Sequence, residues 1–280
     1  MDLTARFIAQ RLTEALEKNV IVDNRPGSGS AVGTGVVANS APDGHTLLVS
    51  HNAMAIIPTL YPKLPYDTLR DFAHVALIGS TTNTLVIYPG LPVRTVKELI
   101  SLAKAKPGVL NFSSTGAGGT STLAMDYFKL FTGTEIVNVP FNGTTPALTA
   151  VMGGQTQLMI SAWPGTIPHV NAKRLIALAT TGAKRSEFLP DLPTLNEADV
   201  PGYEFDTWYG IHVPVKTPKE IVYKLNTTVV KALGRSELKQ QLEKLGIEAG
   251  GLTPEAFDKF VRAEAEKMGK IIKASGARPE

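Results

Sequence analysis

The sequence predicts an α/β fold made of two lobes, and three observations support this. Apolar strands, polar turns and helices alternate through the middle of the chain, which is typical of sheets covered by helices. The 280 residues are enough for two lobes. A helical tail follows the last strand and is expected to return to the first lobe. We therefore expect lobe one over residues 1–90 and 207–280, an inserted lobe two over residues 91–206, and a ligand cleft between them.

The chain is predicted to begin inside a helix. Asp2 is expected to cap this helix, and apolar residues continue along one face as far as Leu16. Because the sequence opens with this helix pattern, no secretion signal is expected within it, and no apolar run is long enough to span a membrane.

Strands are predicted where apolar runs end in polar turns. They cover residues 20–22, 46–49, 75–78, 85–87, 109–112, 136–139, 158–160, 175–180 and 207–211. Thr95 is predicted to cap a helix over residues 96–105, and Gly153 to end another. In the tail, residues from Val222 to Leu233 show helical spacing. The strand, turn and helix rhythm of the middle indicates a parallel sheet.

The composition excludes several classes of protein. Hydrophobic residues make up 43% and charged residues 19%, a globular balance rather than a disordered one. The net charge of +3 comes from interspersed acids and bases, so no nucleic-acid partner is expected. Cysteine is absent, which excludes disulfides and thiolate sites. The five histidines lack metal-ligand spacing, so neither a metal nor a cofactor is expected.

The stretch over residues 111–121 joins a strand end to a helix start through three glycines and several hydroxyls. A helix is predicted to begin near Thr120, where its unpaired N–H groups and the loop backbone would form an anion cradle. No lysine lies in this loop and its glycine spacing matches no nucleotide fingerprint, so an uncharged cradle for a carboxylate is favoured. The simpler interpretation is a tight turn capped by Thr120 or Ser121 that binds no ligand.

Polar turns after strands, near residues 51, 81, 113, 142 and 161, are expected to meet at the ligand crevice. Acidic residues concentrate in the tail, so these neutral side chains predict binding rather than enzymatic catalysis. The two tryptophans, Trp163 and Trp208, are either packing residues or, for Trp208, an apolar wall of the cleft. The full set of predicted ligand-binding residues is His51, Asn52, Thr81, Asn83, Ser113, Thr115, Gly116, Gly118, Thr120, Ser121, Ser161, Trp163 and Trp208.

Short motifs along the whole chain resemble those of one family. They lie at residues 24–29 (Asn-Arg-Pro-Gly-Ser-Gly), 42–47, 114–120, 140–143, 153–155, 200–203 and 208–210 (Trp-Tyr-Gly). In this order they resemble the substrate-binding proteins of tripartite tricarboxylate transporters, the Bug-type receptors. The resemblance implies a periplasmic, two-lobed periplasmic-binding-protein-like (type II) fold that passes a carboxylate to membrane transporter subunits. It also implies ligand contacts from the turns at residues 51–52, 81–83, 113–121 and 161–163, and we expect a monomer.

Two positions depart from the family pattern. The family carries a strand and a glycine loop ahead of the helix that here opens at Asp2, so the resemblance implies that lobe one lacks this strand. Gln157 stands where the family usually has an aspartate.

Two other functions stay open. One is a sensor that presents its ligand to a signalling receptor. The other is a serine hydrolase with Ser113 or Ser121 as nucleophile and the glycine loop as oxyanion hole, although no base is evident near either serine. A dicarboxylate or tricarboxylate, an aromatic acid and an amino acid are all compatible with the predicted site.

Overall fold

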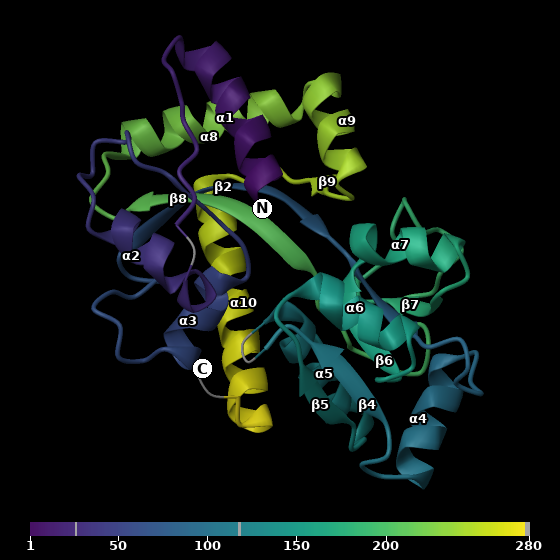
Figure 1. The fold of residues 1–280 in the computed structure, drawn as a ribbon. Coiled ribbons are helices and arrows are strands. Elements are labelled where there is room, and N and C mark those ends of the chain that lie inside the picture. The colour runs from purple at the N-terminus through teal and green to yellow at the C-terminus, as the bar shows by residue number, and fades with distance from the viewer. Residues whose placement is uncertain (26, 117–118, 278–280) are drawn as a thin grey trace. The chain divides into compact units, whose positions relative to one another are not determined.

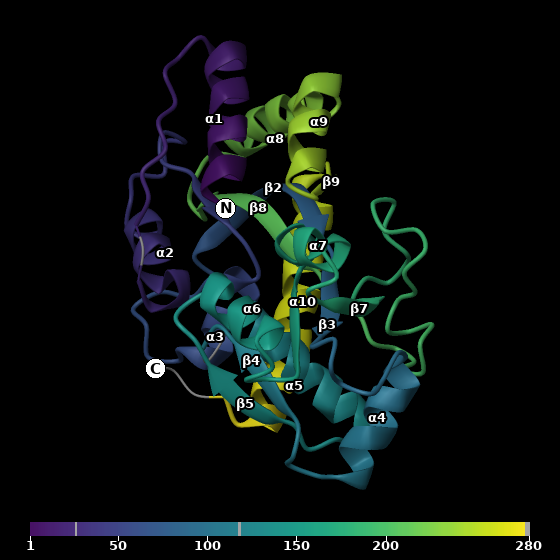
Figure 2. The same ribbon diagram turned by 45° about the vertical axis from the view of Figure 1, so that its right-hand side comes forward.

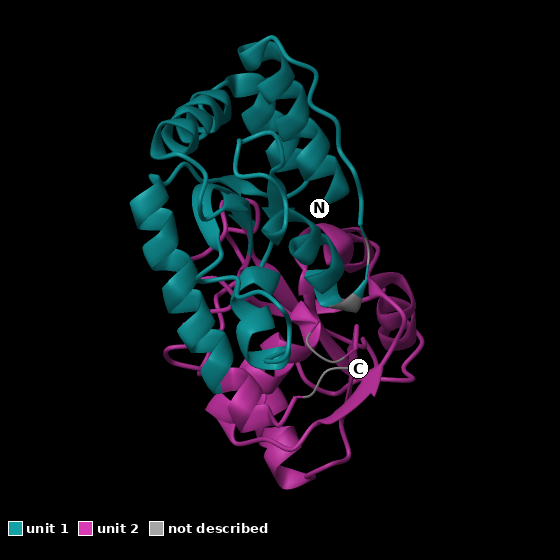
Figure 3. Cartoon of the chain, turned by 90° about the vertical axis from the view of Figure 1, so that its left-hand side faces the viewer, with its two compact units in different colours: residues 1–80, 208–270 teal, residues 81–207, 271–280 magenta. Residues whose placement is uncertain are grey.

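The computed structural model describes residues 1–25, 27–116 and 119–277 (Figure 1). The chain divides into two compact units (Figure 3). Unit 1 comprises Met1–Ser80 and Trp208–Lys270, and unit 2 comprises Thr81–Thr207 and Ile271–Glu280. The chain thus passes from one unit to the other three times, whereas the sequence-based boundaries lay at 90/91 and 206/207.

Unit 1 contains one sheet and the helices from the N-terminal and C-terminal parts of the chain. Its elements are α1 (Asp2–Leu16), η1 (Ser28–Ser30), α2 (Ala31–Ala38), β1 (Leu48–Ser50), α3 (Ala53–Leu60), β2 (Phe72–Thr81), β8 (Thr207–Pro214), α8 (Lys219–Leu233), α9 (Ser236–Lys244), β9 (Glu248–Ala249) and α10 (Pro254–Ser275). Three of these, β2, β8 and α10, begin or end in unit 2.

The sheet of unit 1 has the strand order β1-β8-β2-β9. Helices α1, α8 and α9 lie on one face of this sheet (Figure 1). Ile211 and Val213 of β8 point into the core between these three helices and the sheet. Because strand side chains alternate between faces, His212 points the other way, where its ring stacks on Phe257 of α10.

Two expectations for unit 1 need correction. Met1 occupies the N-cap position of α1, and Asp2 is the first helical residue instead of the cap. Residues 20–22 are not a strand. Within the described residues, β1 is hydrogen-bonded to β8 alone, and no strand pairs with residues 20–22. The Val20 N–H donates to Thr13 Oγ1 at 3.0 Å, which holds this segment against α1.

Unit 2 is a second sheet with its own helices. Its elements are β3 (Asn83–Ile87), α4 (Val96–Ala105), β4 (Asn111–Ser114), α5 (Thr120–Thr132), β5 (Val137–Pro140), α6 (Thr144–Met152), β6 (Leu158–Ala162), α7 (Trp163–Asn171) and β7 (Ile176–Thr180). Its core includes Val86, Leu148 and Met159, which bring α6 onto the sheet.

The expected parallel sheet is only partly correct. Unit 2 has the strand order β5-β4-β6-β3-β7, with β4 parallel to β5 and β6. β3 runs antiparallel to both β6 and β7. The predicted rhythm holds between residues 111 and 171, where each strand is followed by a helix, and parallel strands need such a crossover.

The predicted helix boundaries are confirmed where the sequence contains recognisable capping residues. Thr95 accepts from the Glu98 N–H and Glu98 reaches back to the Thr95 N–H, a complete capping box that starts α4. Helix α5 begins at Thr120, and α6 ends with Gly153 in the C-cap position.

Candidate functional site

Three strands of unit 2 end at one edge of its sheet. β4, β5 and β6 are parallel neighbours, so their carboxyl ends lie together. Each is followed directly by a helix, which is α5, α6 or α7 respectively (Figure 2). The sequence places three helix N-termini at this edge, where N–H groups without intrahelical partners carry partial positive charge.

These three helix starts lack side-chain caps. In the part of the chain that the structure describes, the N-cap residues Gly119, Gly143 and Ala162 make no side-chain cap hydrogen bond. Helix α4 of the same unit has a complete capping box at Thr95. At α7 the first N–H is already used, since that of Trp163 donates to the Thr82 carbonyl at 3.3 Å, and Pro164 has none. The starts of α5 and α6 are therefore the better donors for an anion at this edge, which is the candidate site.

The loop before α5 is braced by its own hydroxyls. The Thr115 N–H donates to Ser121 Oγ at 3.0 Å, and the hydroxyls of Thr115 and Ser121 are 2.9 Å apart. Thr122 Oγ1 donates to the carbonyl of Gly116. Ser113 Oγ is buried and lies 2.6 Å from Thr156 Oγ1. These contacts fix the backbone of the predicted cradle, and Thr120 stands half-buried at the helix start.

Two glycines in this loop are required by its geometry. Gly116 has a φ of +94°, which a side chain strains. A Cβ on Gly119 would lie 2.5 Å from Thr115 Oγ1 and 3.1 Å from the Gly116 carbonyl oxygen. The predicted ligand residue Gly118 lies outside the described residues.

Ser161 and Trp163 lie at the end of β6. Ser161 is buried, and its carbonyl accepts from Thr84 Oγ1 at 3.3 Å. Trp163 is the first residue of α7 and is half-buried, with its ring stacked on Phe188 at a centroid distance of 5.2 Å. Both residues thus belong to the same strand-to-helix junction, and their ligand contacts stay predictions.

Thr81 and Asn83 lie where β2 gives way to β3. Both are buried in unit 2. The Asn83 amide is engaged within the chain: Nδ2 donates to the Phe205 carbonyl at 2.8 Å, and Oδ1 accepts from Thr207 Oγ1 at 3.3 Å. A ligand contact by Asn83 stays a prediction, and its present partners give it a structural role.

In unit 1, Asn52 and Trp208 are joined. Asn52 is the N-cap residue of α3, and its Oδ1 accepts from the backbone N–H of Trp208 at 3.1 Å. The Trp208 ring is buried against Phe257 and Phe260, with centroid distances of 5.8 and 5.5 Å. This is the packing interpretation of Trp208, and its contribution to a cleft wall stays a prediction.

His51 follows β1 and is neutral. Burial lowers its pKa to about 4. Its Nδ1 accepts from the Ala53 N–H at 3.4 Å, which leaves the proton on Nε2, 3.5 Å from Ser30 Oγ. His51 can therefore offer a neutral donor, and Ser30 is a partner that the sequence analysis missed although its glycine-rich loop was recognised.

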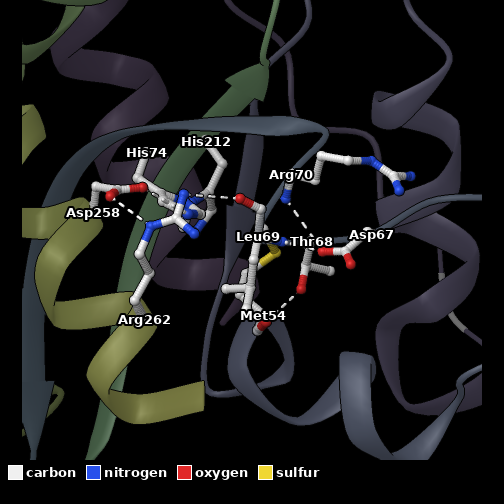
Figure 4. Close-up of polar contacts among 9 residues, drawn as sticks. All are labelled: Met54, Asp67, Thr68, Leu69, Arg70, His74, His212, Asp258 and Arg262. Atoms are coloured by element: carbon white, nitrogen blue, oxygen red, sulfur yellow. Dashed lines mark hydrogen bonds and ion pairs between the residues drawn. The ribbon is translucent and has the colours of Figure 1, made fainter. Parts of the chain in front are cut away.

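Two further histidines form a buried pair that no sequence pattern predicted (Figure 4). His74 of β2 and His212 of β8 have their Nδ1 atoms 2.8 Å apart. His74 Nε2 lies 3.7 Å from an Asp258 carboxylate oxygen, and Arg262 bonds both that carboxylate and the Leu69 carbonyl. Burial lowers the pKa of both imidazoles, so both are neutral near pH 7.

A cavity of about 370 Å³ lies elsewhere in unit 1. It is bordered by α1, residues 20–25, α2 and β1, and its lining is mostly apolar. None of the thirteen predicted ligand residues lines it.

Neither a metal site nor a membrane-spanning helix is found in the residues that the structure describes. No three His, Cys, Asp or Glu side chains are grouped to hold a metal ion. None of the described helices has the length and apolar character needed to cross a membrane.

Sequence comparisons give one family. The family model described as "Tripartite tricarboxylate transporter family receptor" matches residues 4–277. The UPF0065 protein in the tcbD-tcbE intergenic region of Pseudomonas sp. (strain P51) is 33% identical over 97% of this chain and 81% of that protein. Protein BugT of Bordetella pertussis (strain Tohama I) is 30% identical over 99% of this chain and 86% of that protein.

Solved structures agree with the sequence comparisons. R. palustris Rpa4515 with adipate is 36% identical, covers 100% of this chain and 94% of its own, and has a TM-score of 0.87. MatC (Rpa3494) from Rhodopseudomonas palustris with bound malate is 29% identical, covers 97% of this chain and 94% of its own, and has a TM-score of 0.83. Both similarities extend across the two units.

Proposed function

This chain belongs to the tripartite tricarboxylate transporter receptor family, and from that premise we propose that it captures a small organic carboxylate and delivers it to a membrane transporter of that type. Capture in the periplasm is part of the proposal. The expectation that the ligand lies in a cleft between two lobes stays a prediction.

One observation carries the proposal, which is the edge of unit 2 where three uncapped helices begin beside a braced, uncharged loop. An anion gains from unpaired N–H groups, and each charge-assisted hydrogen bond contributes about 1.5–3 kcal/mol. No lysine or arginine lies between Asn111 and Thr120 to demand a phosphate. A carboxylate, with one charge over two oxygens, suits these donors.

The related structures support a small dicarboxylate as the ligand. Adipate and malate, each bound by a relative, both carry two carboxylates on a short aliphatic chain. In unit 1, the neutral His51 and the N-terminus of α3 at Asn52 are candidate partners for a second carboxylate or a hydroxyl.

The hydrolase alternative lacks a catalytic base. Ser113 Oγ is paired with the Thr156 hydroxyl, and Ser121 Oγ accepts from the Thr115 N–H. Neither serine has a hydrogen bond to a histidine or a carboxylate among the described residues, and a nucleophilic serine needs such a base. The sensor alternative would differ in its protein partner rather than in its ligand.

Calorimetric titration against adipate, malate, citrate, benzoate and glutamate tests the proposal. We expect micromolar binding of a dicarboxylate. Thr120→Val should lower the affinity about tenfold, because it removes the hydroxyl of the first residue of α5. Thr228→Val is the control, since Thr228 is a half-buried helical threonine in unit 1 whose hydroxyl bonds the Lys224 carbonyl of its own helix. Absence of binding by every compound would contradict the proposal. Ester hydrolysis that is lost in Ser121→Ala would favour the hydrolase instead.

A further inference from the structure

The side chain of Asn83 joins three separate segments of unit 2. Its Nδ2 donates to the Phe205 carbonyl at 2.8 Å and to Thr181 Oγ1 at 3.2 Å. Its Oδ1 accepts from Thr207 Oγ1 at 3.3 Å. Its backbone N–H donates to Thr181 Oγ1 at 2.9 Å, and its carbonyl accepts from the Thr181 N–H at 3.0 Å. A single buried amide thus connects the start of β3, the residue after β7 and the start of β8.

Two of these segments are places where the chain passes between the units. The first pass lies between Ser80 and Thr81, two residues before Asn83. The second lies between Thr207 and Trp208, and Thr207 is the residue that donates to Asn83. These two passes are therefore tied to the same side chain, whereas the third, between Lys270 and Ile271 within α10, has no part in this tie.

This tie is hard to loosen without a large penalty. Asn83 is 4% exposed, so an amide that lost its partners would stay out of reach of water. Thr181 adds a second link, because its carbonyl accepts from the Phe205 N–H at 2.9 Å. Hinges between two units consist of a few residues at the ends of helices or strands, where the backbone dihedral angles change. When two such segments are tied together, a rotation at one requires a corresponding rotation at the other.

We propose that Asn83 is a positioning residue that locks the two chain passes to each other, so that they turn together when the units rearrange. The pivot then lies on the unit 1 side of the lock, at the last residues of β2 and the first residues of β8. Ligand affinity would depend on the lock, because without it the unliganded protein samples more conformations and binding costs more conformational entropy. This last consequence rests on the proposed function.

Distance measurements in the unliganded protein test the lock directly. Lys97 of α4 and Lys231 of α8 are exposed residues in unit 2 and unit 1, and each can be changed to cysteine for spin labelling. The chain has no cysteine of its own, so only these two positions would react. We expect Asn83→Asp, whose carboxylate repels the Phe205 carbonyl, to broaden the distribution of label-to-label distances.

A milder variant and a matched control keep the test decisive. Thr207→Val removes one hydroxyl of the lock, and Thr132→Val removes a hydroxyl from the far end of α5. The two threonines are 8% and 7% exposed, and both are hydrogen-bonded within unit 2. We expect both variants to lower the melting temperature, but only Thr207→Val to broaden the distances. Equal distance distributions in the two variants would overturn the proposal.

Binding kinetics separate this proposal from the proposed function. With adipate as the probe, we expect Thr207→Val to raise Kd about tenfold through faster dissociation, and Thr132→Val to leave Kd unchanged. If the unmodified chain binds none of the acids, the proposed function fails while the distance measurement still decides the lock. If it binds adipate and the distances do not broaden in Thr207→Val, the lock fails and the function stands.

Discussion

His74 and His212 share one proton across neighbouring strands. With 2.8 Å between their Nδ1 atoms, one nitrogen donates and the other accepts. His74 Nε2 faces the Asp258 carboxylate and carries a proton, so His74 accepts at Nδ1 and His212 donates. A proton added to either ring would place a charge in a buried site that also faces Arg262.

This pair predicts a loss of stability in mild acid. The unfolded chain protonates its histidines near pH 6.5, whereas burial lowers the pKa of folded His74 to about 4 and holds that of folded His212 well below its usual value. Between these values the unfolded state binds more protons, so stability falls as pH decreases. We expect up to about 1.4 kcal/mol per pH unit for each buried histidine.

Urea unfolding at intervals from pH 7.5 to pH 4.5 measures this dependence. The double variant His74→Gln/His212→Gln should have a shallower slope, with part remaining because the pKa of folded His51 is also lowered to about 4. The exposed His45→Gln is the control and should keep the full slope. Equal slopes in the double variant and in the unmodified chain would show that the pair does not titrate as described.

At the residue scale the sequence predicts types of group better than their partners. A strand, a loop of glycines and hydroxyls and a helix start near Thr120 were predicted from local composition, and the role of this loop as an anion cradle stays a prediction. The pairing of Ser113 with Thr156, and of His74 with His212, joins residues 43 and 138 positions apart. No local pattern carries such contacts, because they follow from how distant strands are placed side by side.

Helix α5 offers an element-scale test with two comparable ends. Gly116 precedes its start at a φ of +94°, and Gly133 follows its end at a φ of +61°. Alanine at either position is strained and should lower stability by about 1–2 kcal/mol. Only Gly116→Ala should also weaken carboxylate binding, because only this end holds the candidate site. Calorimetry combined with thermal melts checks both effects, and equal affinities in the two variants would contradict the site.

Elements were predictable where their signal is local. The capping box at Thr95 and the glycine after Met152 state a helix start and a helix end in the sequence. A strand has no comparable signal, since its hydrogen bonds depend on a neighbour. Residues 20–22 have the composition of a strand but pair with none among the described residues, and β3 was expected to be parallel although it runs antiparallel.

For the whole molecule, the proposal predicts that ligand raises the melting temperature. A carboxylate at 100 times its Kd should add about 2.7 kcal/mol of stability, a shift of several degrees. A thermal melt with adipate from below to far above its Kd should show a shift that grows with the logarithm of concentration. Sodium chloride at equal ionic strength is the control, since it separates specific binding from screening. An identical shift with both salts would count against a specific site.

The division of each unit into separate chain segments has a consequence for how such receptors can be recombined. Unit 1 is encoded by two separate stretches of the gene. Unit 2 takes its last residues, 271–280, from the end of α10 and the residues that follow it. One exchange of sequence between two related genes therefore cannot transfer a complete unit. A chimera that carries a foreign unit 2 needs joins after Ser80, Thr207 and Lys270, and a join within α10 must keep the helix in register. Specificity in this protein should therefore diversify more readily by substitution in the strand-to-helix loops than by the exchange of whole units.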